Sequence, residues 1–227
     1  MTFTRYAIYF APPAQAEWTI FATQWLGWDM EAGTEVAHPV IDGVDVAAST
    51  DVPRKYGLHA TLKPPFRLNK GQSLIGLQDA CERLAGTQPP VTLDGFEIAR
   101  LGRFLALRPV GNTDSLNALA AACVRELDSF RAPASAAELD RRRASGLTPE
   151  QDANLLRWGY PYVMDTFRFH ITLSGKLDKP TLKTVQAALE DHLVPLLPAP
   201  CQIKDLALMG EAEDGRFHLI HRYALSG

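Results

Sequence analysis

Two short motifs carry the residue types and spacing that suit catalysis in this sequence. Residues 59–62 read H-A-T-L and residues 170–173 read H-I-T-L. A histidine side chain has an unperturbed pKa of about 6.5, so near neutral pH one imidazole can accept a proton while another donates one. A threonine hydroxyl two positions later can donate a hydrogen bond to an anionic oxygen. The pair of motifs therefore indicates acid–base chemistry on an anionic substrate.

Both motifs lie in segments that we predict as β-strands, residues 57–68 and 166–177, because each is rich in branched and aromatic residues. Side chains alternate between the two faces of a strand, so one face of each segment is apolar and the other polar. The polar faces hold Gly57, His59, Thr61 and Lys63 in the first segment, and Thr166, Arg168, His170, Thr172 and Ser174 in the second. If the two polar faces line one cleft, the histidines and threonines of both motifs converge.

The two motifs belong to an internal repeat. A second pair of matching segments, Gly102–Phe104 and Gly215–Phe217, has nearly the same separation along the chain as the two H-x-T-L motifs. The predicted elements also occur twice in the same order: strand, helix, strand, strand. A single H-x-T on a strand carries little information, but two copies at equivalent positions of a repeat favour a functional role.

The elements that must position these motifs follow from hydrophobic periodicity. Predicted helices cover residues 14–28, 74–85, 114–130 and 180–193, and predicted strands cover residues 5–11, 57–68, 91–100, 103–110, 166–177, 201–210 and 216–225. Residues 29–55 are predicted as loop. We expect an α+β fold with two pseudo-symmetric lobes around a central cleft, each lobe an antiparallel sheet with helices packed outside. Residues 1–227 then form one bilobal domain, with the repeat at about 57–110 and 166–225.

Residues 131–160 interrupt the repeat and are predicted as short helices and loops, an insertion or lid. They contain three consecutive arginines, 141–143. One interpretation of this run is a solvated helix face, and the other is a patch on a lid that recruits a phosphate.

Phosphodiester hydrolysis uses the groups that the two polar faces supply. One imidazole takes a proton from water and the other gives a proton to the departing oxygen. The hydroxyls of Thr61 and Thr172 would bind the non-bridging oxygens, and Lys63 and Arg168 would add positive charge. Three further side chains are candidates for substrate contact: Tyr56, Tyr9 and Ser174.

A metal site is the competing use of paired histidines. Zinc takes three or four closely set His, Cys, Asp or Glu ligands, and no acidic residue falls on either polar face. The three cysteines, Cys81, Cys123 and Cys201, are far apart and lack a C-x-x-C spacing, so neither a zinc knuckle nor a disulfide framework is indicated. We therefore expect no metal and no other cofactor.

Composition restricts the partners. The chain has 227 residues, of which 46% are hydrophobic and 22% charged, with a formal net charge of −3. Proteins that bind long nucleic acids carry a strong basic excess, so a long polyanion is not the expected partner, whereas a small phosphorylated substrate is. No apolar run approaches the ~18 residues of a membrane span, and the first residues lack a signal-peptide pattern. We expect a cytoplasmic protein without membrane contact, and the sequence does not define its oligomeric state.

With these residues in place, the sequence resembles the 2H phosphoesterase superfamily, named for two H-x-T/S-hydrophobic motifs. Both motifs match in full, and the resemblance covers most of the chain outside 131–160. The segments R-Y-A-I-Y-F-A-P-P near the start, Y-G-L-H-A-T-L-K-P-P-F and F-R-F-H-I-T-L-S-G are similar to the branch called DUF1045, which is associated with phosphonate-utilisation operons.

The resemblance implies a bilobal fold and metal-independent hydrolysis of cyclic phosphodiesters or 2′,5′-type linkages. It implies His59 and His170 as acid and base, without saying which is which, and Thr61 and Thr172 on the phosphate. The operon association suggests a ribose cyclic phosphate formed during phosphonate catabolism as substrate. Two alternatives stay open: an enzyme that processes RNA ends with 2′,3′-cyclic or 2′,5′ linkages, and a protein that binds nucleotides or sugar phosphates without catalysis.

Overall fold

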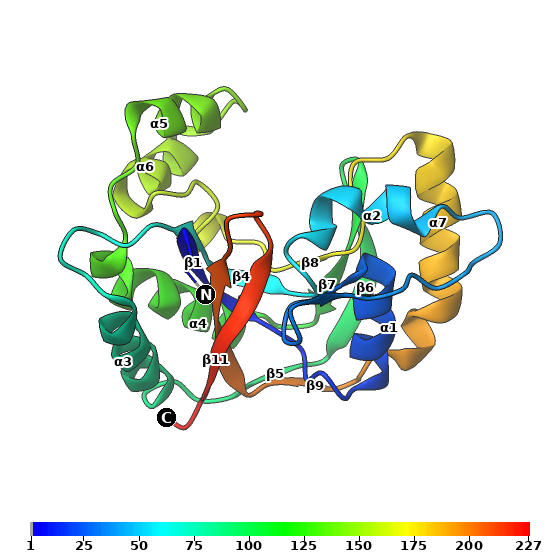
Figure 1. Cartoon of the computed structure of the whole chain (residues 1–227), viewed down its shortest axis with the longest axis horizontal. Helices are drawn as coiled ribbons and strands as arrows, with labels where there is room; N and C mark the ends of the chain where they lie inside the picture. The colour runs from blue at the N-terminus through cyan, green and yellow to red at the C-terminus, as the bar shows by residue number, and fades with distance from the viewer. Residues whose placement is uncertain (1) are drawn as a thin grey trace.

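The computed structural model describes residues 2–227, and its centre is one antiparallel sheet of seven strands (Figure 1). The strands are β1 (Arg5–Phe10), β4 (Ala60–Phe66), β6 (Gly95–Leu101), β7 (Phe104–Val110), β8 (Ile171–Thr172), β10 (Asp205–Glu211) and β11 (Phe217–Ala224). Their order across the sheet is β11-β10-β1-β4-β8-β7-β6. The neighbouring strands β4 and β8, at the middle of the sheet, are therefore the ones that carry the H-x-T motifs.

Helices pack against the sheet and stand at its ends. They are α1 (Glu17–Leu26), α2 (Val46–Arg54), α3 (Leu74–Ala85), α4 (Asp114–Glu126), α5 (Ala136–Arg143), α6 (Pro149–Trp158) and α7 (Lys179–His192). Two small pairs of strands complete the fold, β2 (Trp28–Asp29) with β3 (Thr34–Glu35) and β5 (Val91–Leu93) with β9 (Cys201–Ile203). The expected α+β fold with antiparallel strands and outer helices is confirmed.

The internal repeat is exchanged between the two halves of the sheet. The first copy supplies β4 to one half, but its hairpin β6–β7 lies in the other half beside β8. The second copy supplies β8, and its hairpin β10–β11 lies in the half of β4, where β10 pairs with β1. The helices follow the same rule, since α3 packs against β10 and β11 while α7 packs against β6 and β7. Each half of the molecule is therefore built from both copies.

The hairpin turns preserve the symmetry in their backbones. Gly102 and Gly215 occupy equivalent turns, between β6 and β7 and between β10 and β11, and both have positive φ angles of 66° and 82°. This left-handed conformation strains residues with a Cβ, which accounts for a glycine at each position. The matching segments that marked the repeat in the sequence are thus the two turns.

The main hydrophobic core lies between the sheet and the outer helices. It joins the apolar faces of both sheet halves through residues such as Leu62 and Ile171, and Trp25 of α1 is fully buried in it. A smaller cluster on the opposite face of β1, β10 and β11 includes Tyr9 and Phe217. One face of the sheet is therefore buried in the main core, and the opposite face is covered only in part, by the smaller cluster that includes Tyr9 and Phe217.

Two predicted segments differ from the structure. Residues 166–177 were expected to form one strand, but only Ile171–Thr172 are in the ladder, because the chain then turns away: the Gly175 N–H donates to the Ser49 carbonyl at 2.8 Å. Residues 29–55 were expected to be loop, but they contain α2, whose N-terminus is capped by the Asp45 carboxylate. Pro53 in its last turn and its low hydrophobicity concealed this helix.

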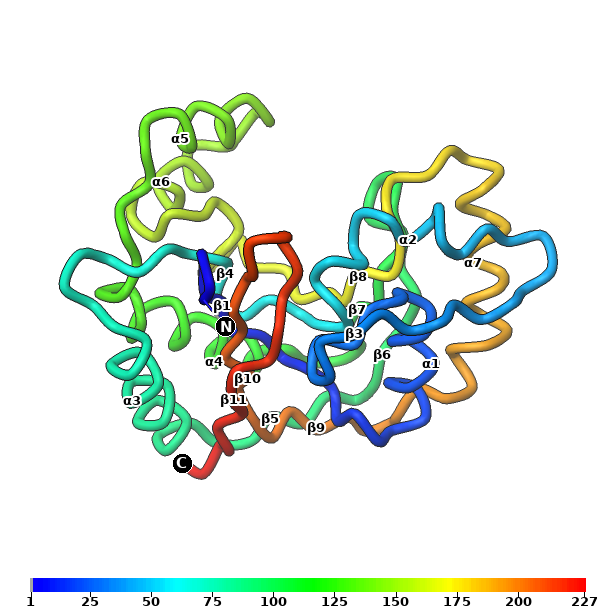
Figure 2. Tube along the Cα trace, viewed as in Figure 1, coloured from blue at the N-terminus to red at the C-terminus, as the bar shows by residue number. Residues whose placement is uncertain are grey.

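The predicted insertion contains the helix pair α5 and α6, which stands apart from the sheet in the trace (Figure 2). Each helix begins with a capping box, Ser135 with Glu138 and Thr148 with Gln151. No residue of α5 is buried, so its position depends on polar contacts and on α6 rather than on a core of its own. No helix within residues 2–227 is both long and apolar enough to cross a membrane.

Candidate active site

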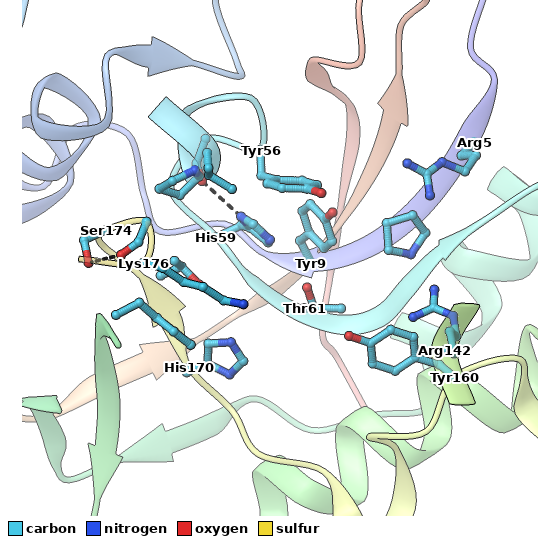
Figure 3. Close-up of a pocket in the computed structure, with 17 residues that line it drawn as sticks. Arg5, Tyr9, Tyr56, His59, Thr61, Arg142, Tyr160, His170, Ser174 and Lys176 are labelled. Carbon is cyan, nitrogen blue, oxygen red and sulfur yellow. Dashed lines mark hydrogen bonds between the residues drawn. The ribbon is translucent and has the colours of Figure 1, made fainter. Parts of the chain in front are cut away.

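Both H-x-T motifs line one cavity of about 410 Å³ on the open face of the sheet (Figure 3). Its floor is β1, β4 and β8, and its walls come from the end of α2 and from the insertion. Ala60 pairs with Ile171, and both of these side chains enter the core. Because neighbouring side chains point to the opposite face, the residues on either side of this pair point into the cavity.

The pairing register arranges the four motif side chains as two facing pairs. Since Ala60 and Ile171 are opposite each other in an antiparallel ladder, His59 lies across from Thr172 and Thr61 lies across from His170. The convergence expected from the sequence is thus brought about by direct pairing of the two motif strands.

Each histidine makes the same type of hydrogen bond, from its Nδ1 to the backbone carbonyl two residues earlier. Nδ1 of His59 lies 3.0 Å from the carbonyl oxygen of Gly57, and Nδ1 of His170 lies 2.8 Å from that of Arg168. A carbonyl oxygen can only accept, so each Nδ1 carries the hydrogen. In each neutral imidazole Nε2 is then the nitrogen with a free lone pair, which is the tautomer needed to accept a proton.

The surroundings of His59 are aromatic. Its ring stacks on Tyr9 with 4.0 Å between ring centroids, and Tyr56 packs on it at 5.8 Å. Burial among these rings, with a smaller contribution from nearby His170, lowers the pKa of His59 to about 4. His59 is therefore neutral at neutral pH in the free protein. Tyr9 and Tyr56, two of the three candidate contact residues, both line the cavity.

His170 has fewer aromatic neighbours than His59. Its one aromatic neighbour within the described chain is Phe104, at 6.1 Å between ring centroids. Thr61 and Thr172 line the cavity, and neither hydroxyl makes a hydrogen bond to another described residue. These hydroxyls are free to donate to a ligand.

Lys63 does not share the face of Thr61, and this part of the sequence prediction is wrong. Tyr9 pairs with Thr61 and Ile8 with Lys63, so β4 has one extra residue between the two pairs, a β-bulge. The bulge turns Lys63 to the core side, where it is 2% exposed. Its ammonium group donates to the Val124 carbonyl at 3.1 Å and lies 3.6 Å from Asp128.

Two other candidates are also placed differently from the expectation. Arg168 is exposed and does not line the cavity, because its guanidinium folds back to donate to the carbonyl oxygens of Asp165 and Phe167. Ser174 lines the cavity, but its hydroxyl accepts from the Leu105 N–H and donates to the Gly175 carbonyl. Ser174 therefore fixes the chain after β8, and its hydroxyl is already engaged.

The cations of the cavity come from residues that the strand pattern did not single out. Arg5, Arg142 and Lys176 line it, together with Tyr160. No aspartate or glutamate is among its lining residues in the described chain, although the protein as a whole has a net charge of −3. The cavity is thus locally positive and suited to an anion.

The arginine run 141–143 divides into three different environments. Arg142 lines the cavity, Arg143 is paired with Asp152, and Arg141 is exposed on the helix surface. Arg141 fits the interpretation as a solvated helix face, whereas Arg142 lies where a phosphate-recruiting residue would have to be. Within residues 2–227 there is no group of three or more His, Cys, Asp or Glu side chains that could hold a metal ion.

Comparison with known proteins gives a family and two relatives with curated names. Residues 61–218 match the family described as "Protein of unknown function (DUF1045)". A Janthinobacterium sp. (strain Marseille) protein named ribose 1,5-bisphosphate phosphokinase PhnN is 36% identical over 219 residues, which cover 93% of this chain and 48% of that protein. A Laribacter hongkongensis (strain HLHK9) protein of the same name is 34% identical over 222 residues, covering 93% and 49%. The chain therefore spans about half the length of the curated relatives it matches.

Solved structures with more distant similarity include Escherichia coli LigT in its apo form, with a TM-score of 0.48 and 18% identity over 100% of both chains. Another is TT0787 of Thermus thermophilus, with a TM-score of 0.45 and 16% identity over 98% of both chains.

Proposed function

The chain belongs to the DUF1045 family, and from its cleft we propose that it is a phosphodiesterase that hydrolyses a small cyclic phosphodiester by two-histidine acid–base catalysis. The observation that carries this proposal is the β4–β8 register, which brings both H-x-T motifs into one cavity. A binding protein needs cations and hydrogen-bond donors for a phosphate. Binding alone does not need two imidazoles that flank the phosphate and are held in the same tautomer.

The substrate phosphate would lie between the two motif strands. The hydroxyls of Thr61 and Thr172, free of other partners in the described chain, donate to its non-bridging oxygens, and Lys176 adds positive charge from the loop after β8. These groups stabilise the negative charge that develops on the oxygens as the water attacks.

His59 acts as the base in this scheme. Its Nε2 has a free lone pair because Nδ1–H is bound to Gly57, and its aromatic surroundings keep the ring neutral in the free protein. An anionic phosphate beside it favours the protonated form, so the basicity of the ring rises when substrate binds. Nε2 takes a proton from water as the water oxygen forms a bond to phosphorus.

His170 acts as the acid. Its protonated imidazole donates to the departing ester oxygen of the cyclic phosphate as the phosphorus–oxygen bond breaks. The product carries a phosphate monoester and, at the departed oxygen, a free hydroxyl. The turnover ends with His59 protonated and His170 neutral, and proton exchange with water restores both. His170 is half-buried and lines the cavity, so its ring remains within reach of water for that exchange.

The relatives' names support a phosphorylated ribose as the substrate class. They are named for an activity on ribose 1,5-bisphosphate, and the chain matches about half of each. This sequence has no G-x-x-x-x-G-K-[S/T] phosphate-binding pattern, so we assign the phosphokinase activity to the half that this chain does not match. A ribose cyclic phosphate as substrate also fits the association of the DUF1045 branch with phosphonate-utilisation operons.

The test is a screen of the purified protein against cyclic phosphodiesters with a chelator present. We expect turnover of a ribose cyclic phosphate, and loss of that turnover in His59→Ala and His170→Ala. Full activity in either variant would overturn the mechanism. Turnover that rises with the length of an RNA oligonucleotide ending in a 2′,3′-cyclic phosphate would instead indicate RNA-end processing, and tight binding without turnover would indicate a binding protein.

A further inference from the structure

The cavity continues beyond the motif residues to a second end. Arg5, Arg142 and Tyr160 lie there, on the opposite side of Tyr9 and Thr61 from His170 (Figure 3). None of these three residues has a role in the two-histidine scheme. The cavity volume of about 410 Å³ is within the range of ~300–1,000 Å³ found for small-molecule sites, so there is room for a substrate larger than one cyclic phosphate.

Arg142 is the uncompensated charge at this end. The central carbon of its guanidinium lies 4.5 Å from the centroid of the Tyr160 ring, and no carboxylate in the described chain forms an ion pair with it. Stacking on an aromatic ring orients a guanidinium while leaving its N–H groups available to a ligand. The arrangement presents a planar set of donors to the cavity.

The neighbouring charges do not cancel that of Arg142. Arg5 also lines this end, but it donates two hydrogen bonds to the Glu211 carboxylate, so this pair is close to neutral together. Lys176 lies on the His170 side of the cavity. The Arg142 end therefore carries about one net positive charge, separate from the charge beside the motifs.

The insertion is fixed so that Arg142 reaches the cavity. Arg67, just after β4, donates two hydrogen bonds to the Glu138 carboxylate of α5, at 3.0 and 2.7 Å. Arg143 joins α5 to Asp152 of α6 in the same bidentate manner. Because α5 has no buried residue, these ion pairs and the Tyr160 stack are what hold it. Arg141, one residue earlier, is exposed and does not line the cavity.

We propose that the Arg142–Tyr160 end is a subsite for a second phosphate, so that the substrate is a cyclic phosphodiester that also carries a phosphate monoester. This inference rests on the proposed function and defines its substrate class. A monoester phosphate near neutral pH has one to two negative charges and three acceptor oxygens, which suit a guanidinium with free donors. The ribose bisphosphate in the relatives' name also carries two phosphates on one sugar.

Two probes that differ only in the second phosphate test the subsite: ribose 1,2-cyclic phosphate and the same compound phosphorylated at O5. We expect the wild type to prefer the phosphorylated probe, and Arg142→Gln to lower kcat/KM for that probe by about 10- to 100-fold, the value of a charge-assisted contact. For the unphosphorylated probe the change should stay within about twofold. Arg141→Gln, on the same helix, is the matched control and should change neither. An equal loss on both probes, or no loss on either, would overturn the subsite.

Failure of the proposed function can be distinguished from failure of the subsite. If neither cyclic probe is hydrolysed, the phosphodiesterase proposal fails, and calorimetric binding of ribose 1,5-bisphosphate and of ribose 1-phosphate tests the subsite alone. We expect tighter binding of the bisphosphate, with the difference lost in Arg142→Gln and kept in Arg141→Gln. Equal binding of the two ligands by the wild type would contradict the second phosphate site.

Discussion

His59 and His170 are held by the same bond, from Nδ1 to the carbonyl oxygen two residues earlier, yet they lie in different surroundings. His59 is packed against two tyrosines, and burial lowers its pKa to about 4. His170, also half-buried, has Phe104 as its one aromatic neighbour in the described chain. The two copies of the motif thus share their backbone geometry but differ in the aromatic side chains packed around the histidine.

The difference has a chemical meaning. An acid and a base must be in opposite protonation states at the same pH, and identical surroundings would give two identical imidazoles. Strand β1 supplies the asymmetry, because it lies between β4 and the hairpin β10–β11, whereas β8 pairs directly with β7 of the other hairpin. Tyr9 belongs to β1, so the extra N-terminal strand is what makes the His59 side aromatic.

Removal of either imidazole should have the largest effect on turnover. We expect His59→Ala and His170→Ala each to lower kcat by about a thousandfold, within the range for a general acid or base. The measurement is single-substrate kinetics on a ribose cyclic phosphate. His221→Ala, an exposed histidine on β11 outside the cavity, is the control and should keep wild-type activity. A small loss in only one of the two variants would break the proposed division of roles.

Removal of one threonine hydroxyl should have the next largest effect. Thr61→Val and Thr172→Val keep the shape of the side chain and delete a donor to the phosphate, so we expect kcat/KM to fall by about 10- to 100-fold in each. Similar losses would show that the two hydroxyls remain equivalent although the two histidines differ. Activity within twofold of the wild type in both variants would argue against their contact with the phosphate.

The dependence of kcat/KM on pH tests whether the tyrosines packed on His59 lower its pKa. Protonated His59 cannot accept a proton, so kcat/KM should fall as the pH drops towards about 4. Tyr56→Ala exposes the ring to water, which raises the pKa of His59 towards its ordinary value, and the acid limb should move to higher pH by about one unit. Tyr56→Phe keeps the packing and should leave the limb in place. Circular dichroism at each pH separates this shift from unfolding, and an unmoved limb in Tyr56→Ala would contradict the assigned cause.

The smallest effect on turnover should come from the lysine that the sequence pattern favoured. Lys63→Met leaves the cavity intact, so kcat/KM should stay within about twofold. The Val124 carbonyl loses its donor, which should lower the free energy of unfolding by about 1–2 kcal/mol in a urea titration. Lys176→Met, the comparison within the cavity, should raise KM by about tenfold without that loss of stability. The reverse pattern would place the phosphate on the other face of the sheet.

Much of the fold was predictable because its elements have strong local signals. The helix at 74–85 begins and ends where hydrophobic periodicity indicated, and both hairpin turns lie at the repeated segments that start with Gly102 and Gly215. The strand at 166–177 and the helix α2 were not predicted correctly. In both places the backbone finds partners far along the chain or is capped locally, and the pattern of apolar residues does not record either.

The candidate site was predictable only in part, for a similar reason. Arg5, Arg142 and Lys176 come from three segments with no common spacing, so no sequence pattern joins them. Lys63 followed the alternation of an ideal strand, but a one-residue bulge reversed its direction. Single cations on a surface are usually solvated, and only their position around a shared cavity gives them a role.

The sequence by itself determined the chemistry of the motifs: two imidazoles and two hydroxyls, repeated at equivalent positions on strands whose other face is apolar. Alternation along a strand and the repeat are local properties, so they can be read from residue order. The tertiary structure decided the surroundings of each copy of the motif. Pairing of β4 with β8, the extra strand β1 and the docked helix α5 depend on contacts between distant segments, and these contacts give His59 its aromatic wall and bring Arg142 to the cavity.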